Sequence, residues 1–559
     1  MKKQHRSEGG RKARFQTVRC SLLASAVMSV MAPAVSHAFM IDTGNPDLRV
    51  LWDTTAKYST AFRVEDQNAR LIADTQGNWP NTDDGNRNFD KGLISNRLDL
   101  LTELDVIYKR KYGFRLSGAA WYDSEYHGHN DNDSPSTNNN LSADYNEFTG
   151  GTRDLHGSDA ELLDAFVFGR FDVADKPLTV RAGRHTLLWG ESLFYGANGI
   201  ANAQAPIDVV KAQSVPNTQF KELMRPVNQI SGQIQLLPNV ALGAYYQLEW
   251  GKTLLPGAGS YFSGVDFMSE GAERMLLASD GSVYFERQND LEADDSGQGG
   301  LQMRFRVGAV DYGLYAVRYH EKTPQIYVLP GIDAGSTSAG IKAGEYRWVY
   351  PENVRSFGAS ATTTIGNVNF AAEVSIRRNT PLNSDAQTDL TGTADNNDNA
   401  LYAVGNSAHA QLNWLASLGP SFISREADFL GEIAWNRVTS ISENENAYNP
   451  NATRDALNIR MVYEPKYRQV MPGLDLSVPV GLGYGLNGNS SVVGAFLGED
   501  VGDISVGLNG IYLDKWRFGA TYTHYFGPVD NVIDEDGHGS YAQSLADRDF
   551  IAFSIRRTF

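Results

Sequence analysis

The densest group of side chains able to do chemistry lies between residues 181 and 225. It combines both signs of charge with one large aromatic ring: Arg181, Arg184, Trp189, Glu191, Asp208, Lys211, Glu222 and Arg225. Carboxylates beside cationic groups can transfer protons, bind a charged solute or neutralise one another. These eight residues are the candidate site, and their role depends on the elements that position them.

The arrangements typical of enzymes are missing from the sequence. The ten histidines are scattered, and there is no His-Glu-x-x-His, no Gly-x-Ser-x-Gly and no cysteine pair. Residues 483–488 match a dinucleotide fingerprint in their letters, but no helix is expected after them and the first glycines fall in a predicted strand. We therefore expect no enzymatic activity, no cofactor and no metal site.

Alternating apolar and polar residues predict strands along most of the chain. In 368–377, Val374 and Ile376 fall on one face and Glu373 on the other, because a strand shows successive side chains to opposite sides. Membrane-spanning strands need about 9–11 residues of this pattern. The clearest are 50–62, 98–108, 114–123, 240–250, 301–307 and 368–377. Weaker ones are 162–171, 178–185, 229–237, 310–319, 355–364, 406–415, 428–436, 456–464, 474–485, 503–513, 516–526 and 550–559.

The connections between these segments alternate in length. Short ones include 109–113, 172–177, 238–239, 308–309, 365–367 and 514–515. Long ones include 64–96, 124–160, 186–228, 251–299, 320–354, 383–404, 437–455 and 527–549. Bacterial barrels have short periplasmic turns and long extracellular loops, whereas a soluble sandwich has no reason to separate its loops in this way. The sequence thus predicts an all-β fold, a transmembrane antiparallel β-barrel of about 18 strands (16–20); residues 282–287 are a candidate for one more hairpin arm.

The first 38 residues have the three parts of a secretory signal peptide. A basic lead is followed by the apolar stretch 22–35 and by Ser36-His37-Ala38, a small-x-Ala cleavage site. A membrane anchor is the alternative, but the apolar stretch is short and Pro33 interrupts it. We expect cleavage to leave 39–559 as a single barrel in the outer membrane of a Gram-negative bacterium.

The last predicted strand, 550–559, has one apolar and one polar face and ends in Phe559. This ending resembles the signal by which the barrel-assembly machinery recognises its substrates, although Arg557 stands where that signal prefers an apolar residue. An ordinary edge strand is the alternative. Phe559 is therefore the candidate assembly signal, and that machinery is an expected partner.

The composition excludes some classes of function. The formal net charge is −17 at pH 7, which argues against binding nucleic acid. No apolar run after residue 38 is long enough for a spanning helix. Because lipid tolerates no unpaired backbone, the mature chain can cross a membrane only as a closed barrel. Trp250 and Trp516 are then expected to face lipid or a subunit interface.

The segment 186–228 differs from the other long loops because it is partly apolar. It contains Trp189, Phe194, Tyr195, Ile200, Val209 and Val210. A long apolar loop must be buried somewhere, and we expect it to fold into the lumen as a constriction. A surface loop packed on its neighbours is the alternative.

The remaining loops are rich in Asp, Asn and Gly. Residues 130–134, 395–398 and 534–536 have the carboxylates and amides that could bind calcium or bridge lipopolysaccharide phosphates. None forms a complete calcium-loop pattern, so solvated loops facing lipid and lipopolysaccharide are the prediction.

Several motifs together resemble one proteobacterial outer-membrane family of unknown function. They are Arg181-Ala-Gly-Arg184, Trp189-Gly-Glu191, Ile207-Asp208, Lys211, Pro226, the stretch 319–324, Tyr350-Pro-Glu352, Glu373 and Pro381-Leu382. The resemblance implies a porin-like barrel. It also implies two partners, a periplasmic carrier-like protein and an inner-membrane resistance-nodulation-division transporter of the lipid-exporting kind, and hence hydrophobic cargo.

Three functions remain open at this point. The first is a porin-like channel for small solutes, favoured by inward-facing charges such as Arg115, Arg304 and Glu432. The second is a transporter of hydrophobic compounds, or a non-conducting part of a lipid or sterol trafficking system. The third is a surface structural protein, which the loops favour least because they show no repeats.

Overall fold

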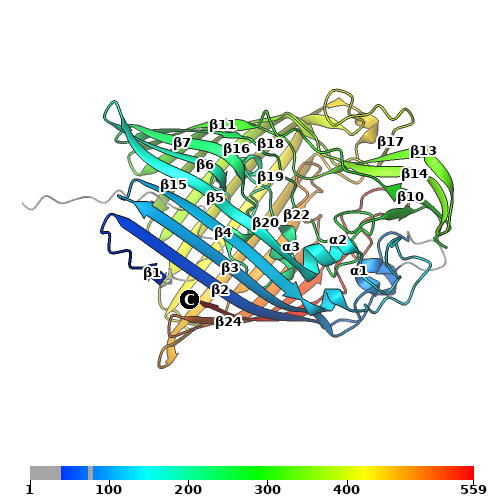
Figure 1. Ribbon diagram of the computed structural model, residues 1–559, viewed down its shortest axis with the longest axis horizontal. Coiled ribbons are helices and arrows are strands. Elements are labelled where there is room, and N and C mark those ends of the chain that lie inside the picture. The colour runs from blue at the N-terminus through cyan, green and yellow to red at the C-terminus, as the bar shows by residue number, and fades with distance from the viewer. Residues whose placement is uncertain (1–38, 73–79) are drawn as a thin grey trace, which may run out of the picture.

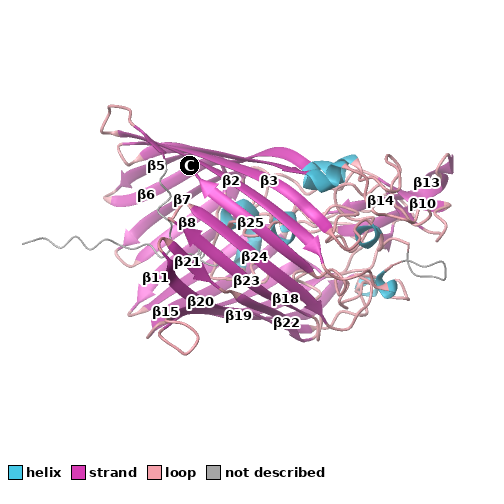
Figure 2. Ribbon diagram, turned by 90° about the horizontal axis from the view of Figure 1, so that it is seen from below, coloured by secondary structure: helices cyan, strands magenta, loops and turns pink. Residues whose placement is uncertain are grey.

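The structure is a closed antiparallel β-barrel (Figures 1 and 2). It is a computed structural model that describes residues 39–72 and 80–559, so the predicted signal peptide lies outside the described residues. The first wall strand, β2 (Leu48–Arg63), pairs with β3 (Leu93–Tyr108) on one side and with the last strand, β25 (Phe550–Thr558), on the other. This last pairing closes the sheet and removes both edges, which an open sheet would leave unpaired.

Eighteen strands form the wall within the described residues, as the sequence predicted. After β2 and β3 come β4 (Tyr112–Asp123), β5 (Ser158–Val173), β6 (Lys176–His185), β7 (Val227–Leu237), β8 (Val240–Gln247), β11 (Gly299–Val307), β12 (Val310–Tyr319), β15 (Val354–Ile365), β16 (Val368–Pro381), β18 (Val404–Leu418), β19 (Glu426–Glu443), β20 (Asp455–Met471), β21 (Leu474–Ser477) with β22 (Val480–Asn487), β23 (Gly502–Tyr512), β24 (Trp516–Phe526) and β25. A short strand β1 (Phe39–Ile41) adds to the start of β2.

The strands β21 and β22 are two halves of one wall strand. Both pair with β20 on one side and β23 on the other. The break falls at Pro479, which has no N–H to donate to the ladder. Its carbonyl still accepts the N–H of Gly507 at 2.8 Å, so the wall stays continuous across the interruption.

The wall is apolar outside and polar inside, the reverse of a soluble protein. On β16, Val374 and Ile376 are 55% and 47% exposed, whereas Glu373 and Arg377 are each 2% exposed. Similarly exposed apolar side chains continue around the outer face: Trp52, Leu98, Phe114, Val167, Leu242, Leu301, Phe357, Leu412, Val506 and Phe553. Such a surface is stable against hydrocarbon rather than against water.

Tight turns join the strands at one end of the barrel. Several use two successive residues in the left-handed region: Lys109 and Arg110, Ala174 and Asp175, Leu513 and Asp514. Positive φ at both central positions gives the twist that suits a two-residue hairpin. The long connections lie together at the opposite end (Figure 1), and the predicted alternation of loop length is therefore a separation of the two barrel ends.

The long loops contain a second sheet, which was not predicted from the sequence. Its strands are β9 (Arg274–Leu276), β10 (Val283–Arg287), β13 (Gln325–Thr337), β14 (Gly340–Val349) and β17 (Gln387–Thr388). β13 and β14 extend beyond the barrel wall (Figure 1). The segment 282–287, considered as another hairpin arm of the wall, pairs in parallel with β14 instead. Buried rings of Tyr327, Tyr346 and Trp348 give this sheet a core of its own.

One outward-facing aromatic was placed wrongly from the sequence. The structure ends β8 at Gln247, so Trp250 belongs to the following loop, where it is buried against Tyr350 with ring centroids 4.8 Å apart. Trp516, at the start of β24, is 37% exposed on the outer face. Among the described residues no helix is both long and apolar enough to cross a membrane.

Candidate functional site in the barrel interior

The segment between β6 and β7, residues 186–226, lies inside the barrel. It holds three short helices, η4 (Ile200–Ala203), α3 (Val209–Ser214) and α4 (Phe220–Leu223). Both ribbon views show helices within the outline of the wall (Figures 1 and 2). The contacts below show that this inner segment touches wall strands on opposite sides of the barrel.

Two glutamates of the wall hold the first half of the inner segment. Glu432, on β19, accepts the backbone N–H groups of Leu193, Phe194 and Tyr195 through one carboxylate oxygen, at 3.1 and 2.8 Å for the outer two. Glu373, on β16, accepts the N–H groups of Glu191 and Ile200 at 2.8 and 2.7 Å. The two carboxylates together take up five backbone N–H groups, which fixes the backbone of the segment on the wall.

Side chains of the neighbouring strands add further bonds at the same place. Arg377 donates to the carbonyl oxygens of Ala197 and Gly199 at 2.8 and 2.9 Å. Asn198 is buried among amide and imidazole groups, with its Oδ1 2.9 Å from His409 Nδ1 and its Nδ2 3.2 Å from Gln411 Oε1. The segment is therefore bonded to three adjacent strands, β16, β18 and β19, through wall side chains that point into the lumen.

The apolar residues of the segment are buried against the wall. Trp189 packs edge-on against Tyr245 of β8, with ring centroids 4.8 Å apart, and lies 6.4 Å from the ring of Tyr315 on β12. Ile200 is 1% exposed in the same cluster. Tyr195 packs against Phe496 at 5.1 Å. The apolar content that marked this loop in the sequence thus serves packing on the inner wall.

The second half of the segment reaches the opposite wall. Lys211 pairs with Glu161 of β5 and lies 3.4 Å from Asp208, and Arg225 approaches Glu161 at 3.5 Å. Lys221 pairs with Glu103 of β3. Asn217 donates to the hydroxyl of Ser554 on β25 at 2.7 Å. Together with the glutamates of β16 and β19, these contacts make the segment a bridge across the interior.

Local capping explains the two helices of this half. The Asp208 carboxylate accepts the N–H of Lys211 at 2.8 Å and begins α3, and Glu222 accepts the N–H of Gln219 at 2.8 Å and begins α4. Such caps satisfy N–H groups that a helix leaves free. Burial raises the pKa of the Asp208 carboxyl, and Lys211 opposes the shift.

The eight candidate residues do not form one cluster. Asp208, Lys211 and Arg225 meet at Glu161, whereas Glu191 lies 3.8 Å from Arg304, and burial raises its pKa against the effect of that guanidinium. Arg181, on the β6 wall, stacks over Phe166 at 5.7 Å. Arg184, near the end of β6, is 2.7 Å from Glu249. Trp189 and Glu222 have the packing and capping contacts given above.

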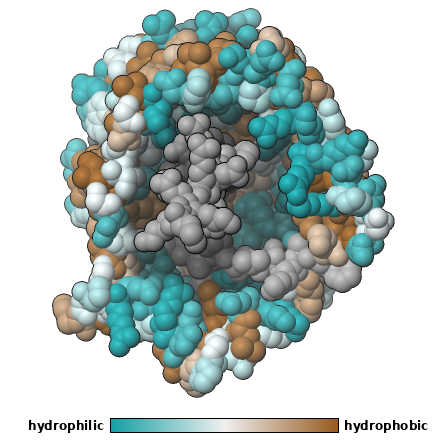
Figure 3. Space-filling model, turned by 90° about the vertical axis from the view of Figure 1, so that its left-hand side faces the viewer, coloured by the Kyte–Doolittle hydropathy of each residue, from teal (hydrophilic) through white to brown (hydrophobic). Residues whose placement is uncertain are grey.

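Part of the interior charge stays accessible beside the bridge. Arg115, on β4, pairs with Glu103, with Asp105 at 2.8 Å and with Asp164 at 3.0 Å, and its side chain is 25% exposed. Figure 3 looks onto the short-turn end, where hydrophilic residues gather around the mouth of the barrel. Charged side chains are therefore exposed both inside the wall, at Arg115, and at this end.

A family of related proteins matches nearly the whole chain. The family described as "Protein of unknown function (DUF1302)" matches residues 19–559. The chain belongs to the DUF1302 family. This membership agrees with the resemblance noted from the sequence motifs. No curated protein matches this DUF1302 chain.

Several solved structures are similar to this DUF1302 protein at low identity. Acinetobacter baumannii OccAB1 is 9% identical, with 94% of this chain and 98% of that chain covered and a TM-score of 0.42. Pseudomonas aeruginosa OccK5 (OpdH) is 10% identical, with 91% and 98% covered and a TM-score of 0.40. A Salmonella typhi OmpF complex with daunomycin is 9% identical, with 93% and 100% covered and a TM-score of 0.35. Similarity at this level transfers neither a ligand nor a mechanism.

Sequence reasoning alone did not find the wall partners of the bridge in this DUF1302 protein. Glu373 and Glu432 were assigned to the inner face by alternation, but nothing in the sequence paired them with residues 191–200, which lie up to 239 positions away. The available signal was their position, since a carboxylate in the middle of a wall strand must find donors within the barrel. Glu103 carries the same signal on the opposite wall, whereas Glu161 lies just before the predicted strand 162–171 and near the start of β5.

Proposed function

We propose that this protein is an outer-membrane, porin-like channel for small solutes, in which the inner segment 186–226 forms the constriction. The bridge from Glu373 and Glu432 on one wall to Glu103 and Glu161 on the other carries the proposal. An 18-stranded barrel is wide enough for an aqueous passage, and a segment fixed across it determines what can pass. No catalytic step is part of this proposal.

The outer face supports an outer-membrane location. Apolar side chains such as Val374, Leu301 and Phe553 are exposed all around the wall, and a closed barrel leaves no backbone group unpaired in lipid. The predicted signal peptide supplies export, and Phe559 supplies an ending of the kind that the barrel-assembly machinery binds. Lipid and lipopolysaccharide are then the surroundings of the wall and of the long loops.

The distribution of polarity favours hydrophilic solutes. Trp189, Tyr195 and Ile200 are buried, so these three apolar side chains do not line the passage, whereas Phe194 and Phe220 are half-buried. Charged groups are accessible as well, with Arg115 among three carboxylates and Arg304 beside Glu191. Opposite charges facing a narrow passage orient and select solutes by their charge.

A second candidate function rests on the same bridge. A segment bonded to both walls also suits a barrel that conducts no ions and passes hydrophobic compounds, with a periplasmic carrier-like protein and an inner-membrane resistance-nodulation-division transporter as partners. In that case the protein is one component of a lipid or sterol trafficking system. A surface structural role is the third and least supported candidate.

Ion conductance in a planar bilayer tests the channel. The refolded protein is compared with a variant in which residues 186–226 are replaced by a two-residue Asn-Gly turn. We expect stepwise openings from the wild type and a conductance several times larger from the variant. A silent wild type with a conducting variant would support the plugged barrel of the second candidate, and two silent barrels would refute the assignment of the segment as the constriction.

A further inference from the structure

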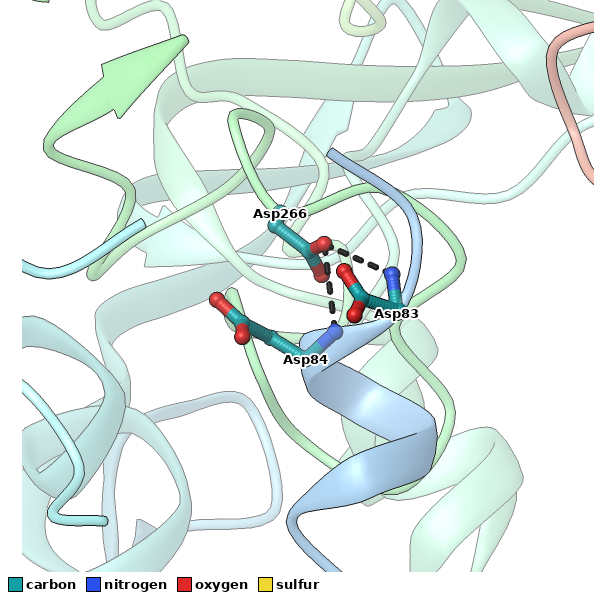
Figure 4. A group of neighbouring side chains, drawn as sticks. All are labelled: Asp83, Asp84 and Asp266. Carbon is teal, nitrogen blue, oxygen red and sulfur yellow. Dashed lines mark hydrogen bonds between the residues drawn. The ribbon is translucent and has the colours of Figure 1, made fainter. Parts of the chain in front are cut away.

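Three buried aspartates meet where the long loops converge (Figure 4). Asp83 and Asp84 begin α1 (Asp84–Arg87), in the loop between β2 and β3. Asp266 comes from the loop between β8 and β11, 183 positions away. One carboxylate oxygen of each lies within 4.8 Å of those of the other two, and each residue is at most 3% exposed.

The negative charge of this cluster is only partly compensated. Arg87 pairs with Asp83 at 2.6 Å. Among residues 39–72 and 80–559, the cations that act on Asp84 and Asp266 do so without a salt bridge: Arg274 faces Asp84, and Arg548 faces Asp266. Burial, and then repulsion by Asp83, raises the pKa of Asp84 to about 7. Several carboxylates removed from water cannot all stay ionised unless a cation joins them.

An asparagine outside the acidic cluster lines the same small cavity and has an unpartnered amide oxygen. Asn139, from the loop between β4 and β5, is 3% exposed and lines this cavity with Asp84 and Asp266. Its Nδ2 donates to Asn81 Oδ1 and to the carbonyl of Arg274, both at 2.8 Å. The amide is thereby oriented, and its Oδ1 is left without a hydrogen-bond donor. A buried oxygen without a hydrogen-bond donor lowers the stability of the fold unless a water or a cation binds it.

The carboxylates themselves also keep free oxygens. Oδ1 of Asp83 and Oδ1 of Asp266 are buried and unpartnered. The other oxygen of Asp266 accepts the N–H groups of Asp83 and Asp84 at 2.9 and 3.2 Å, which fixes its orientation at the start of α1 (Figure 4). Asp83 and Asp266 thus each have one oxygen held by the protein and one available as a ligand, whereas both oxygens of Asp84 already accept hydrogen bonds and would bind an ion through their remaining lone pairs.

The surrounding loops hold the cluster in a fixed geometry. A Cβ added to Gly85 would lie 2.5 Å from the carbonyl oxygen of Ser263, so only glycine lets α1 pack this closely on the loop 248–298. Asn132 donates to Asp84 at 3.1 Å, and the N–H of Asn139 donates to it at 2.9 Å. Ligands supplied by three separate loops are therefore placed before any ion arrives.

We propose that Asp83, Asp84, Asp266 and the Oδ1 of Asn139 form a calcium site that fastens three loop segments, 80–92, 124–157 and 248–298, together. Oxygen-only ligands select hard cations. Mg²⁺ usually keeps several of its waters, whereas Ca²⁺ accepts an irregular set of carboxylate and amide oxygens. A small, buried set of oxygens from separate loops thus suits Ca²⁺.

Calorimetric titration of the refolded, EDTA-treated protein in detergent tests the site. CaCl₂ should bind with one high-affinity site in the wild type, and Asp266→Asn should weaken that binding at least tenfold. The matched control is Asp534→Asn, because Asp534 lies in another acidic loop and bonds to Asn451 and His538; it should bind as the wild type does.

Other outcomes overturn the proposal. Absence of a high-affinity site in the folded wild type would show that the carboxylates share protons instead. Equal binding by wild type and Asp266→Asn would place the ion elsewhere. Tighter binding of MgCl₂ than of CaCl₂ would refute the choice of ion. If Asp266→Asn does not fold, Asp84→Asn replaces it, and the wild-type titration stands by itself.

Discussion

The carboxylate of Glu432 lies 2.8 Å from the backbone nitrogen of Tyr195, and the same oxygen also accepts the N–H groups of Leu193 and Phe194. A single side chain of the wall thereby takes up three donors of the inner segment. Glu432 takes up more donors of the segment than any other side chain of β19 among the described residues, so it is the most direct point at which to loosen the proposed constriction.

Glu432→Ala should release the segment from the wall. The change leaves three backbone donors without an acceptor, at about 1–3 kcal/mol for each buried group, while the backbone pairing of β19 remains. We expect larger and noisier single-channel currents than in the wild type. Glu426→Gln, on the same strand but exposed near the turn end and paired with Arg468, is the control. Unchanged currents in folded Glu432→Ala would contradict this role.

Arg115→Gln should make the passage more selective for cations. The substitution removes one positive charge from beside Glu103, Asp105 and Asp164, and among the described residues only Glu103 keeps another salt-bridge partner, Lys221. The reversal potential in a salt gradient measures the change, and the ratio of cation to anion permeability should rise several-fold. Arg468→Gln, exposed near the turns, should leave it unaltered. An equal shift in both variants would argue against a passage beside Arg115.

Without divalent cations, the stability of the loop region should fall as the pH rises. The pKa of Asp84 is raised from 3.8 to about 7 by burial and by repulsion from Asp83, so the folded protein binds more protons than the unfolded chain between these values. The contribution of Asp84 to the free energy of unfolding is fully present below about pH 4 and is lost as the pH rises to about 7. Melting temperatures in EDTA between pH 4 and 8 measure it. Asp84→Asn should flatten the profile, and a wild-type profile that rises instead would refute the assignment.

Val374→Arg tests the orientation of the wall in a membrane. Val374 is 55% exposed on the outer face and lies in the middle of β16. An arginine near the middle of the bilayer costs about 2–4 kcal/mol, whereas one near the interface costs about 0–1 kcal/mol. Unfolding from lipid vesicles should show the larger loss for Val374→Arg and the smaller for Ile365→Arg, at the turn end of β15. Equal small losses would indicate that the outer face does not meet lipid.

Phe559→Ala should lower the amount of folded barrel in the outer membrane. The backbone of Phe559 pairs with Thr54, and its side chain is 56% exposed and 4.6 Å from the Arg557 guanidinium. Since the ring is free for recognition, we expect a several-fold loss of heat-modifiable protein in membrane fractions. Phe553→Ala, on the same face of β25, is the control. Equal losses from both changes would assign the effect to the lipid face rather than to the chain end.

The wall could be predicted from the sequence because a barrel strand alternates with a period of two over its whole length. Segments such as 368–377 and 516–526 carry that pattern locally. In the second sheet, β9, β10 and β17 were missed because they are short, and β10 pairs in parallel with a distant strand. The hairpin of β13 and β14 is long enough to see, but its register shifts between Pro330 and Gly335, which interrupts the alternation. Trp250 was misplaced because the alternation continues past the end of β8 at Gln247, and sequence alone does not show where wall becomes loop.

The candidate site shows the same limit. The unusual composition of 186–228 was visible in the sequence, as were the inward carboxylates Glu373 and Glu432. Their contact was not visible, because it joins residues that only barrel closure brings together. The eight candidate residues were chosen for their charge and proximity in the chain, but most of their partners lie on strands far away in the sequence, such as Glu161 for Lys211.

The two ends of the inner segment are neighbours, since His185 and Val227 pair across β6 and β7. The whole segment is therefore an insertion in a hairpin that could close without it. If the segment is the constriction proposed above, replacing it would change what the barrel passes while leaving strand order, register and closure intact. The segment 186–226 could therefore diverge in evolution independently of the wall, and a different segment could be inserted by design between His185 and Val227.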